Sequence, residues 1–356
     1  MFTLAVLGEI YSRENVVATV LAHHPRNSLR HRIRHQDQLI GPLIEKTGVP
    51  SLYLQTSVRN CFRTRVNSRS SGLVLYFATL LPYLVSGAIR TITFSYELTL
   101  LYVQNNAGVP VFAHDRSRWE SISRLADDLS DLYATRVRII NINSALSKHG
   151  AFSVLVRRYP EYLSALFMCE ATLDRKTKWC GQCWKCFEYV LMCLKEKTPC
   201  EIDIDTYIAE AQYIRNVFEA VSGLQKHVDT GNLCWSEAYG GHPVHYTTMC
   251  HSFAHLDMDY VRTVVSIPTA AKLDSMKKWF GNRYFLLFDG YVKTNLDRLT
   301  ISKKTELQAL LSKTISACYD ENELFLCGDE WVSLHTELQR DLPALQAQDL
   351  IADPAA

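Results

Sequence analysis

The chain lacks an excess of charge of either sign. Its 38 lysine and arginine residues nearly balance 37 acidic residues, so the formal net charge is +1. A protein with so little net charge has no overall field that would attract a polyanion or an anionic bilayer. We therefore expect neither a nucleic acid nor a membrane as a partner.

The chain also lacks a membrane-spanning run and a secretion signal. The most apolar stretch, residues 72–88, is shorter than the roughly 18 apolar residues of a span, and Pro82 interrupts it. We expect a buried helix there. Residues 1–10 show no basic segment followed by a small-residue cleavage site. The 11 cysteines, an odd number without such a signal, favour thiols in a reducing cytoplasm over a disulfide framework.

Cysteine spacing is the most informative feature that is present. Cys180, Cys183 and Cys186 follow one another at C-x2-C-x2-C spacing, with Cys169 upstream. Soft thiolate ligands at such spacing favour a tetrahedral Zn²⁺ ion, and Gly181 suits the turn between the first two. Four thiolates leave no open position for water, so we expect a structural zinc site. The H-x-E and H-E-x-x-H patterns of zinc enzymes are absent.

Other metal or thiol arrangements remain open at this point. A thioredoxin-type redox pair is the main alternative, but it leaves the third cysteine unexplained. Cys193 or Cys200 could replace Cys169 as the fourth ligand. Four histidines would offer a second metal site, yet no carboxylate stands at metal-motif spacing, which favours ordinary core or surface histidines. These histidines are His242, His245, His251 and His255.

Strand and helix patterns alternate over the first part of the chain. Short apolar runs predict strands at residues 15–22, 51–57, 90–95 and 137–142. Helical patterns lie between them, at residues 28–46, 71–86 and 117–133. This alternation predicts an α/β fold with a doubly wound parallel sheet.

Basic and polar residues follow the first predicted strands. In a parallel sheet, ligands bind beyond the carboxyl ends of the strands. His23, His24 and Arg26 follow the first strand, and the segment after the second contains Arg69. The third is followed by residues 95–97. This edge therefore suits an anionic or phosphorylated ligand, although a solvated basic loop would have the same composition.

The strand signals fade after residue 150. We expect three parts: an α/β domain at residues 1–165, a zinc-binding knuckle with its following helix at residues 166–200, and a mostly helical C-terminal extension at residues 201–356. The knuckle leads into a helix predicted at residues 187–197.

The order of these features resembles a known family. An α/β part followed by C-x10-C-G-x-C-x-x-C is similar to the 7-cyano-7-deazaguanine synthase (QueC-like) family of the PP-loop, or N-type ATP pyrophosphatase, superfamily, which has an adenine nucleotide alpha hydrolase-like fold. The resemblance implies that Cys169, Cys180, Cys183 and Cys186 bind zinc, with a first spacing two residues longer than in the family. It also implies ATP and Mg²⁺ as cofactors and adenylation of a small carboxylate, such as a 7-deazaguanine, by a C–N ligase.

Further residues gain roles from this resemblance. Arg69, between Ser68 and Ser70, occupies the place of a family arginine near nucleotide and substrate. Asp115 and Arg116 stand roughly where the family has an Asp-Cys-Arg substrate motif. The combination of the histidines and Arg26 with the Ser-Arg-Ser segment is most similar to the defence-associated (QatC-like) branch, in which a partner protein is modified in anti-phage defence.

One departure from the family concerns its phosphate loop. The S-G-G-x-D-S motif is absent, while residues 2–10 look like the helix that should follow it. We expect that the loop either precedes Met1 or has been lost. In the second case the protein would be a non-catalytic, zinc-stabilised partner subunit. A PP-loop-like epimerase of peptidoglycan precursors, which has a similar W-C-G-x-C-x-x-C motif, is a further alternative.

Overall fold

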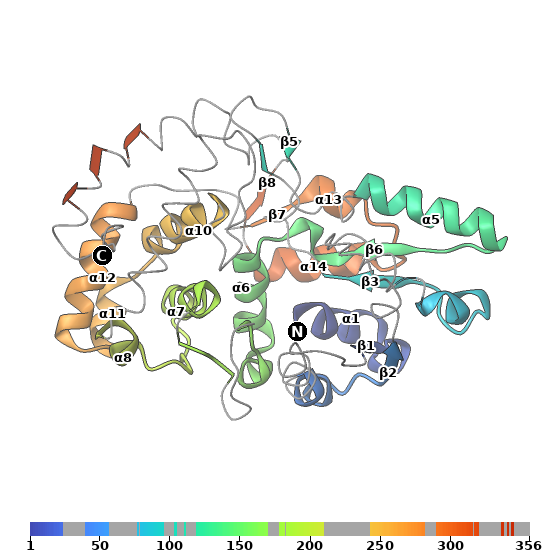
Figure 1. Ribbon diagram of the computed structural model, residues 1–356, viewed down its shortest axis with the longest axis horizontal. Coiled ribbons are helices and arrows are strands. Elements are labelled where there is room, and N and C mark those ends of the chain that lie inside the picture. Colours follow the sequence, from blue (N-terminus) through green and yellow to red (C-terminus); the bar gives the residue numbers. More distant parts are fainter. Residues whose placement is uncertain are drawn as a thin grey trace. The chain divides into compact units, whose positions relative to one another are not determined.

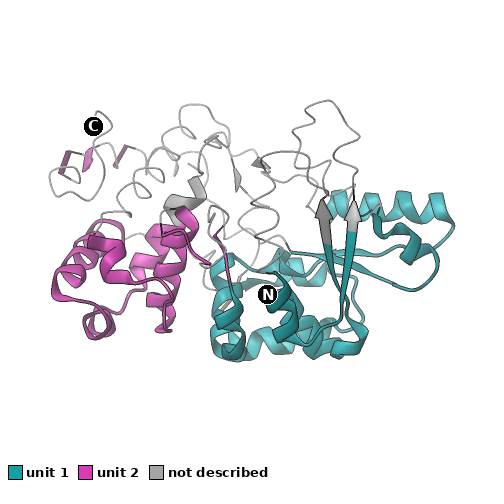
Figure 2. Cartoon of the chain, turned by 60° about the horizontal axis from the view of Figure 1, so that its bottom comes forward, with its two compact units in different colours: residues 1–101, 113–166, 289–321 teal, residues 102–112, 167–288, 322–356 magenta. Residues whose placement is uncertain are grey.

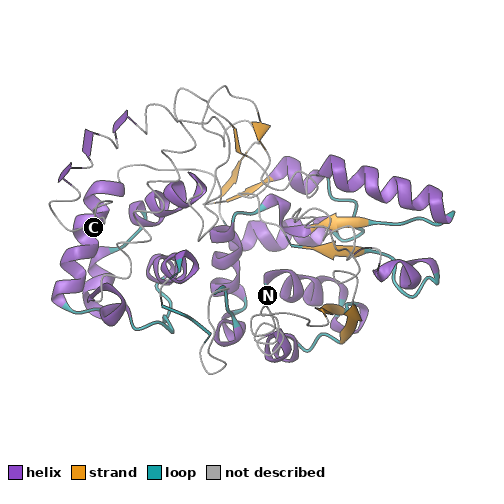
Figure 3. Cartoon of the chain, in the orientation of Figure 1, coloured by secondary structure: helices purple, strands orange, loops and turns teal. Residues whose placement is uncertain are grey.

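A computed structural model describes most of the chain. The described residues are 1–23, 40–56, 77, 79–95, 103–104, 110–111, 119–169, 178–181, 183–209, 243–281, 290–315, 317–319 and six residues between 336 and 344. They form a mixed α/β structure that is mostly helical and contains small parallel sheets (Figures 1 and 3).

Two compact units make up the chain, and each contains segments that are distant in sequence. Unit 1 comprises residues 1–101, 113–166 and 289–321, and unit 2 comprises residues 102–112, 167–288 and 322–356 (Figure 2). The division that we predicted at residues 165 and 200 was drawn from sequence motifs, and it stays a prediction. Residues 289–321, which we expected in the C-terminal extension, contribute a strand pair and helices to unit 1.

Unit 1 contains three parallel strand pairs and the helices around them. Its elements are α1 (Phe2–Tyr11), η1 (Arg13–Asn15), β1 (Ala18–His23), β2 (Ser51–Thr56), β3 (Ile92–Phe94), α5 (Trp119–Tyr133), β6 (Ile139–Asn141), η4 (Ile142–Ala145), α6 (Lys148–Arg158), η5 (Pro160–Ala165), β7 (Gly290–Val292), α13 (Lys293–Asp297), α14 (Lys304–Thr314) and β8 (Ala317–Tyr319). The pairs are β1–β2, β3–β6 and β7–β8, each parallel. The expected parallel strands are therefore present as two-stranded pairs.

The apolar stretch predicted as a buried helix is helical in its described part. Residues 77 and 79–85 are helical, and the side chains of Phe77, Leu80 and Leu84 are buried. They pack with Ile92 of β3 and Ile122 of α5 in one apolar core. Among the described residues, no helix has both the length and the hydrophobicity needed to cross a bilayer.

Unit 2 is a group of helices around a second apolar core. Its elements are β4 (Val103–Gln104), β5 (Pro110–Val111), α7 (Trp184–Glu196), α8 (Ile204–Ala209), α10 (Pro243–Ala254), α11 (Met258–Val264) and α12 (Ile267–Phe280). β4 and β5 form an antiparallel pair. In α7, Trp184, Phe187, Val190, Leu191 and Leu194 recur at helical spacing and are all buried in this core. This apolar face explains why α7 packs against α10.

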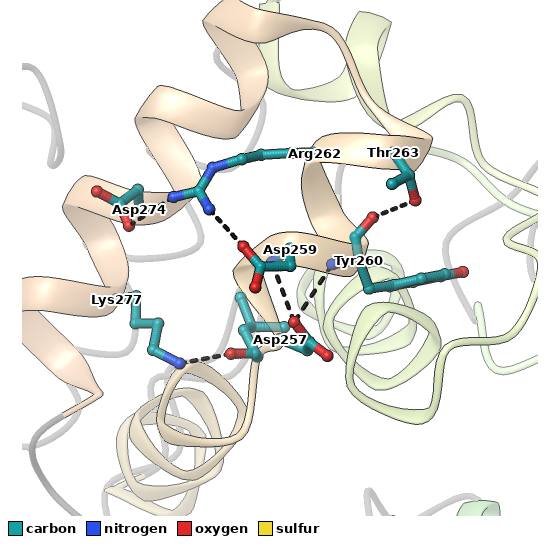
Figure 4. A network of polar contacts seen from close by, with 8 residues as sticks. Asp257, Asp259, Tyr260, Arg262, Thr263, Asp274 and Lys277 are labelled. Carbon is teal, nitrogen blue, oxygen red and sulfur yellow. Dashed lines mark hydrogen bonds and ion pairs between the residues drawn. The ribbon is translucent and has the colours of Figure 1, made fainter.

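Asp257 fixes the start of α11. Its Oδ1 atom accepts hydrogen bonds from the backbone N–H groups of Asp259 and Tyr260 at 3.0 and 3.2 Å (Figure 4). These two donors would otherwise have no partner within the helix. Arg262 lies 2.9 Å from the Asp259 carboxylate and 3.9 Å from that of Asp274, which joins α11 to α12.

The same aspartate should give unit 2 part of its acid sensitivity. Lys197 donates to Asp257 at 2.6 Å and, with the N–H of Tyr260, holds the pKa of this carboxyl below its ordinary value. A lowered folded-state pKa stabilises the fold above the unfolded-state pKa, and this stabilisation is lost as the pH falls through the folded value. We expect Asp257→Asn to flatten the loss of stability below about pH 4.

Urea denaturation at a series of pH values measures this effect. Lys197→Met provides a matched variant, because it removes the cation while keeping the carboxylate, and it should flatten the same acid limb. Wild-type pH dependence in both variants would show that the ion pair contributes nothing.

Gly281 ends α12 at a position too tight for any side chain. A Cβ atom there would lie 2.6 Å from the carbonyl oxygen of Lys277 and 3.0 Å from that of Phe253. Lys277 in turn donates through Nζ to the carbonyl oxygen of Leu256. We expect Gly281→Ala to lower the free energy of unfolding by about 1–3 kcal/mol, because backbone atoms must move.

Gly41 supplies the control for this substitution. It is helical, and a Cβ atom there would meet only the Tyr53 hydroxyl at 3.6 Å. Gly41→Ala should be neutral or stabilising by up to about 1 kcal/mol, since alanine favours helix. Chemical denaturation of both variants makes the comparison, and equal effects would contradict the steric account.

Candidate metal centre

Four cysteine side chains of unit 2 converge at the start of α7. Cys169 follows η5, Cys180 precedes the turn at Gly181, Cys183 is the residue before the helix, and Cys186 lies in its first turn. Gly181 has φ +68°, a left-handed conformation that glycine adopts without steric cost. The backbone N–H groups of Cys186 and Phe187 both donate to the Cys183 carbonyl oxygen, at 3.0 and 3.2 Å, so the helix begins at the knuckle.

The distances between the sulfur atoms fit a tetrahedral ion. The Sγ atoms of Cys169 and Cys183 lie 3.8 Å apart, those of Cys180 and Cys186 3.8 Å apart, and those of Cys183 and Cys186 3.7 Å apart. All four lie within 4.8 Å of one another. Metal–sulfur bonds of about 2.3 Å give a tetrahedron with edges of about 3.8 Å. The cluster could therefore bind a metal ion such as zinc.

Hydrogen bonds among the four thiols favour one thiolate, at Cys169. The pKa of Cys169 falls to about 6: a hydrogen bond with Cys180 raises it, but those with Cys183 and Cys186 lower it by more. Hydrogen bonds to Cys169 and to Cys180 raise the pKa values of Cys183 and Cys186. The arrangement thus stabilises one thiolate through neighbouring S–H groups, and a cation would replace those protons.

Glu201 holds Lys178 and Trp179, the two residues that precede Cys180. Lys178 forms an ion pair with its carboxylate, and the indole N–H of Trp179 donates to it at 3.0 Å. The Trp179 ring stacks on the Tyr189 ring of α7 with centroids 4.0 Å apart. Glu201 and Tyr189, which follow the cluster in sequence, therefore hold the two residues that precede Cys180. No spacing signal in the sequence points to this contact.

No family model, curated protein or solved structure matches this chain. The comparisons leave the resemblance drawn from the cysteine motif as a prediction.

The described part of the chain includes few of the other predicted site residues. His23 ends β1, with its backbone in register with Thr56 of β2, so it lies at the carboxyl end of that pair as expected. The remaining predicted nucleotide and substrate residues lie outside the described residues. These are His24, Arg26, Ser68, Arg69, Ser70, Asp115 and Arg116.

A polar cluster that the sequence did not single out lies at the carboxyl ends of β3 and β6. The hydroxyl group of Thr3, in the first turn of α1, lies 2.8 Å from Ser95 Oγ and 3.1 Å from Asn143 Oδ1. Asn143 Nδ2 donates to Ser95 Oγ at 2.5 Å. Of these residues, only Ser95 lies in a segment predicted to face a ligand. The asparagines that follow the apolar residues of β6 were a signal that could have added Asn143.

Two of the four histidines, His251 of α10 and His255 just after that helix, lie next to each other. The rings of His251 and His255 lie 4.6 Å apart, and the Cys169 cluster is the metal-like group among the described residues. The interpretation of the four histidines stays a prediction, because the side chains of His242 and His245 lie outside the described residues.

Proposed function

We propose that the chain is a zinc-stabilised protein of the carboxylate-adenylating type, similar to 7-cyano-7-deazaguanine synthase. The observation that carries the proposal is the four-cysteine cluster in the order C-x10-C-G-x-C-x-x-C, which opens helix α7. Four thiolates fill the coordination shell of zinc, so the ion would stabilise unit 2 and would leave the chemistry to other residues.

The parallel strand pairs of unit 1 support a nucleotide-binding role. In doubly wound α/β proteins, phosphate groups bind at the carboxyl ends of parallel strands, next to a helix N-terminus. The carboxyl ends of β3 and β6 meet the first turn of α1 through Thr3, Ser95 and Asn143. These hydroxyl and amide groups would orient a bound nucleotide, and the basic residues after β1 would neutralise its phosphates.

In this proposal ATP activates a carboxylate. A carboxylate oxygen attacks the α-phosphate of ATP and pyrophosphate leaves. An amine then attacks the acyl carbon of the acyl-adenylate, a C–N bond forms, and AMP leaves. A 7-deazaguanine carboxylate is the substrate class that the family resemblance implies, and modification of a partner protein in defence is the related role of the QatC-like branch.

Exchange of labelled pyrophosphate into ATP tests the proposal. The measurement uses this chain and a version extended upstream by any in-frame S-G-G-x-D-S loop, each with a panel of carboxylates that includes 7-carboxy-7-deazaguanine. We expect carboxylate-dependent exchange in the form that carries the loop and none in the other. Equal exchange in both forms would contradict the role of the loop, and no exchange in either would favour the non-catalytic partner subunit.

A further inference from the structure

Glu201 lies beyond α7 in sequence, but its carboxylate contacts the two residues that precede Cys180. Helix α7 ends before Lys197, and Glu201 lies in the connection to α8. The Oε2 atom of Glu201 accepts a hydrogen bond from the indole N–H of Trp179 at 3.0 Å. Both carboxylate oxygens also contact the Nζ atom of Lys178. One carboxylate therefore ties down two successive residues next to a cysteine of the cluster.

The indole ring of Trp179 is held on its face as well as at its N–H group. It stacks on the ring of Tyr189, a buried residue of α7, with an interplanar angle of 14°. The side chains of Lys178 and Glu201 are 25% and 32% exposed, and such an ion pair contributes little by itself. Here the same carboxylate also accepts from the stacked indole. The three contacts together restrict the residues before Cys180.

The other three cysteines are positioned by different parts of unit 2. Cys169 is buried, and Cys183 and Cys186 belong to the start of α7, where the Cys186 N–H donates to the Cys183 carbonyl oxygen at 3.0 Å. Cys180 is partly exposed and is followed by the turn at Gly181. Apart from its neighbours in the chain, no atom of the described residues would lie within 4 Å of a Cβ atom at Gly181. The position of Cys180 thus depends mainly on the residues before it.

We propose that Glu201 is a positioning residue of the metal site, which holds Cys180 ready for the ion without binding the ion itself. This role rests on the proposed zinc site and adds to it a residue outside the cysteine motif. If three ligands are already in place, binding must still order the fourth, and the entropy lost in doing so weakens the affinity. Replacing residues that orient metal ligands typically weakens metal affinity by about 10- to 100-fold.

Competition for zinc with a chromogenic chelator tests this role on the full chain. We expect Glu201→Ala to weaken zinc affinity roughly tenfold and to speed the release of zinc to the chelator. One ion with four sulfur neighbours should still bind, because Glu201 supplies no ligand. Glu201→Gln keeps an oxygen that accepts from Trp179 but loses the charge that pairs with Lys178. Its affinity should lie between those of the wild type and Glu201→Ala.

Lys197→Met is the matched control for these variants. It removes another ion pair of unit 2, the one with Asp257 at 2.6 Å, which involves neither the cysteines nor the residues before Cys180. This variant should keep wild-type zinc affinity. Wild-type affinity in Glu201→Ala would overturn the positioning role. Equal weakening by Glu201→Ala and Lys197→Met would also overturn it, because general destabilisation would then explain both.

Trp179→Phe tests the same role if Glu201→Ala does not fold. It keeps a ring that stacks on Tyr189 and removes only the N–H group that Glu201 accepts. We expect a zinc affinity between those of the wild type and Glu201→Ala, and wild-type affinity would contradict the role of Glu201 alone. A wild-type chain that binds no zinc would contradict the metal site and this role together.

Discussion

Replacing Cys186 with serine is expected to abolish metal binding and to unfold the part of unit 2 around α7. Its side chain is fully buried, and its sulfur lies 3.7 to 3.8 Å from two of the other ligands. A serine hydroxyl is a poor zinc ligand that would remain protonated at neutral pH. Structural zinc sites contribute on the order of 10 kcal/mol to folding, which is comparable to the whole stability of a typical domain. Elemental analysis should show zinc falling from about one ion per chain to nearly none.

Cys250→Ser is the matched control for this loss. Cys250 is also fully buried, but it lies on α10 outside the cluster. The Cys250→Ser variant makes the same chemical change at similar burial. It should therefore retain the zinc ion and lose only a modest part of its free energy of unfolding. Equal zinc content in the two variants, or equal loss in both, would contradict the assignment of Cys186 as a ligand.

Truncating Phe253 to alanine is expected to lower the free energy of unfolding of unit 2 by about 3–5 kcal/mol. The ring is fully buried on α10, and its centroid lies 6.0 Å from that of Phe280 on α12. Removing it leaves a cavity where α10 meets the two helices that it contacts most, α7 and α12. Urea denaturation followed by circular dichroism measures the change.

Ile267 provides an exposed control for the Phe253 substitution. It begins α12 with 86% of its surface exposed, so Ile267→Ala should change stability by less than about 0.5 kcal/mol. A Phe253 variant as stable as the Ile267 variant would show that the core of unit 2 is assigned to the wrong residues.

The sequence predicted those elements whose signal is local. The apolar runs became β1, β2, β3 and β6 within a few residues of the expected bounds, and the amphipathic pattern became α5. The cysteine spacing predicted the cluster, because knuckle geometry depends on short turns such as the one at Gly181. A strand or helix that buries one face or both has a recognisable pattern of apolar residues in the sequence. A metal site has a recognisable spacing between its ligands.

Contacts between distant segments left no such signature. Thr3 and Asn143 are 140 positions apart, and nothing in either segment indicates the other. β7 and β8 have three residues each, too few for a period to be recognised, and they return a late part of the chain to unit 1. The same limit explains why Glu201 was missed as the residue that holds Lys178 and Trp179.

X-ray absorption at the zinc edge of the purified full chain tests the central claim most directly. The account predicts one zinc ion per chain with four sulfur neighbours at about 2.3 Å, supplied by Cys169, Cys180, Cys183 and Cys186. A folded unit 2 without bound zinc, or a zinc ion with nitrogen or oxygen neighbours, would contradict it.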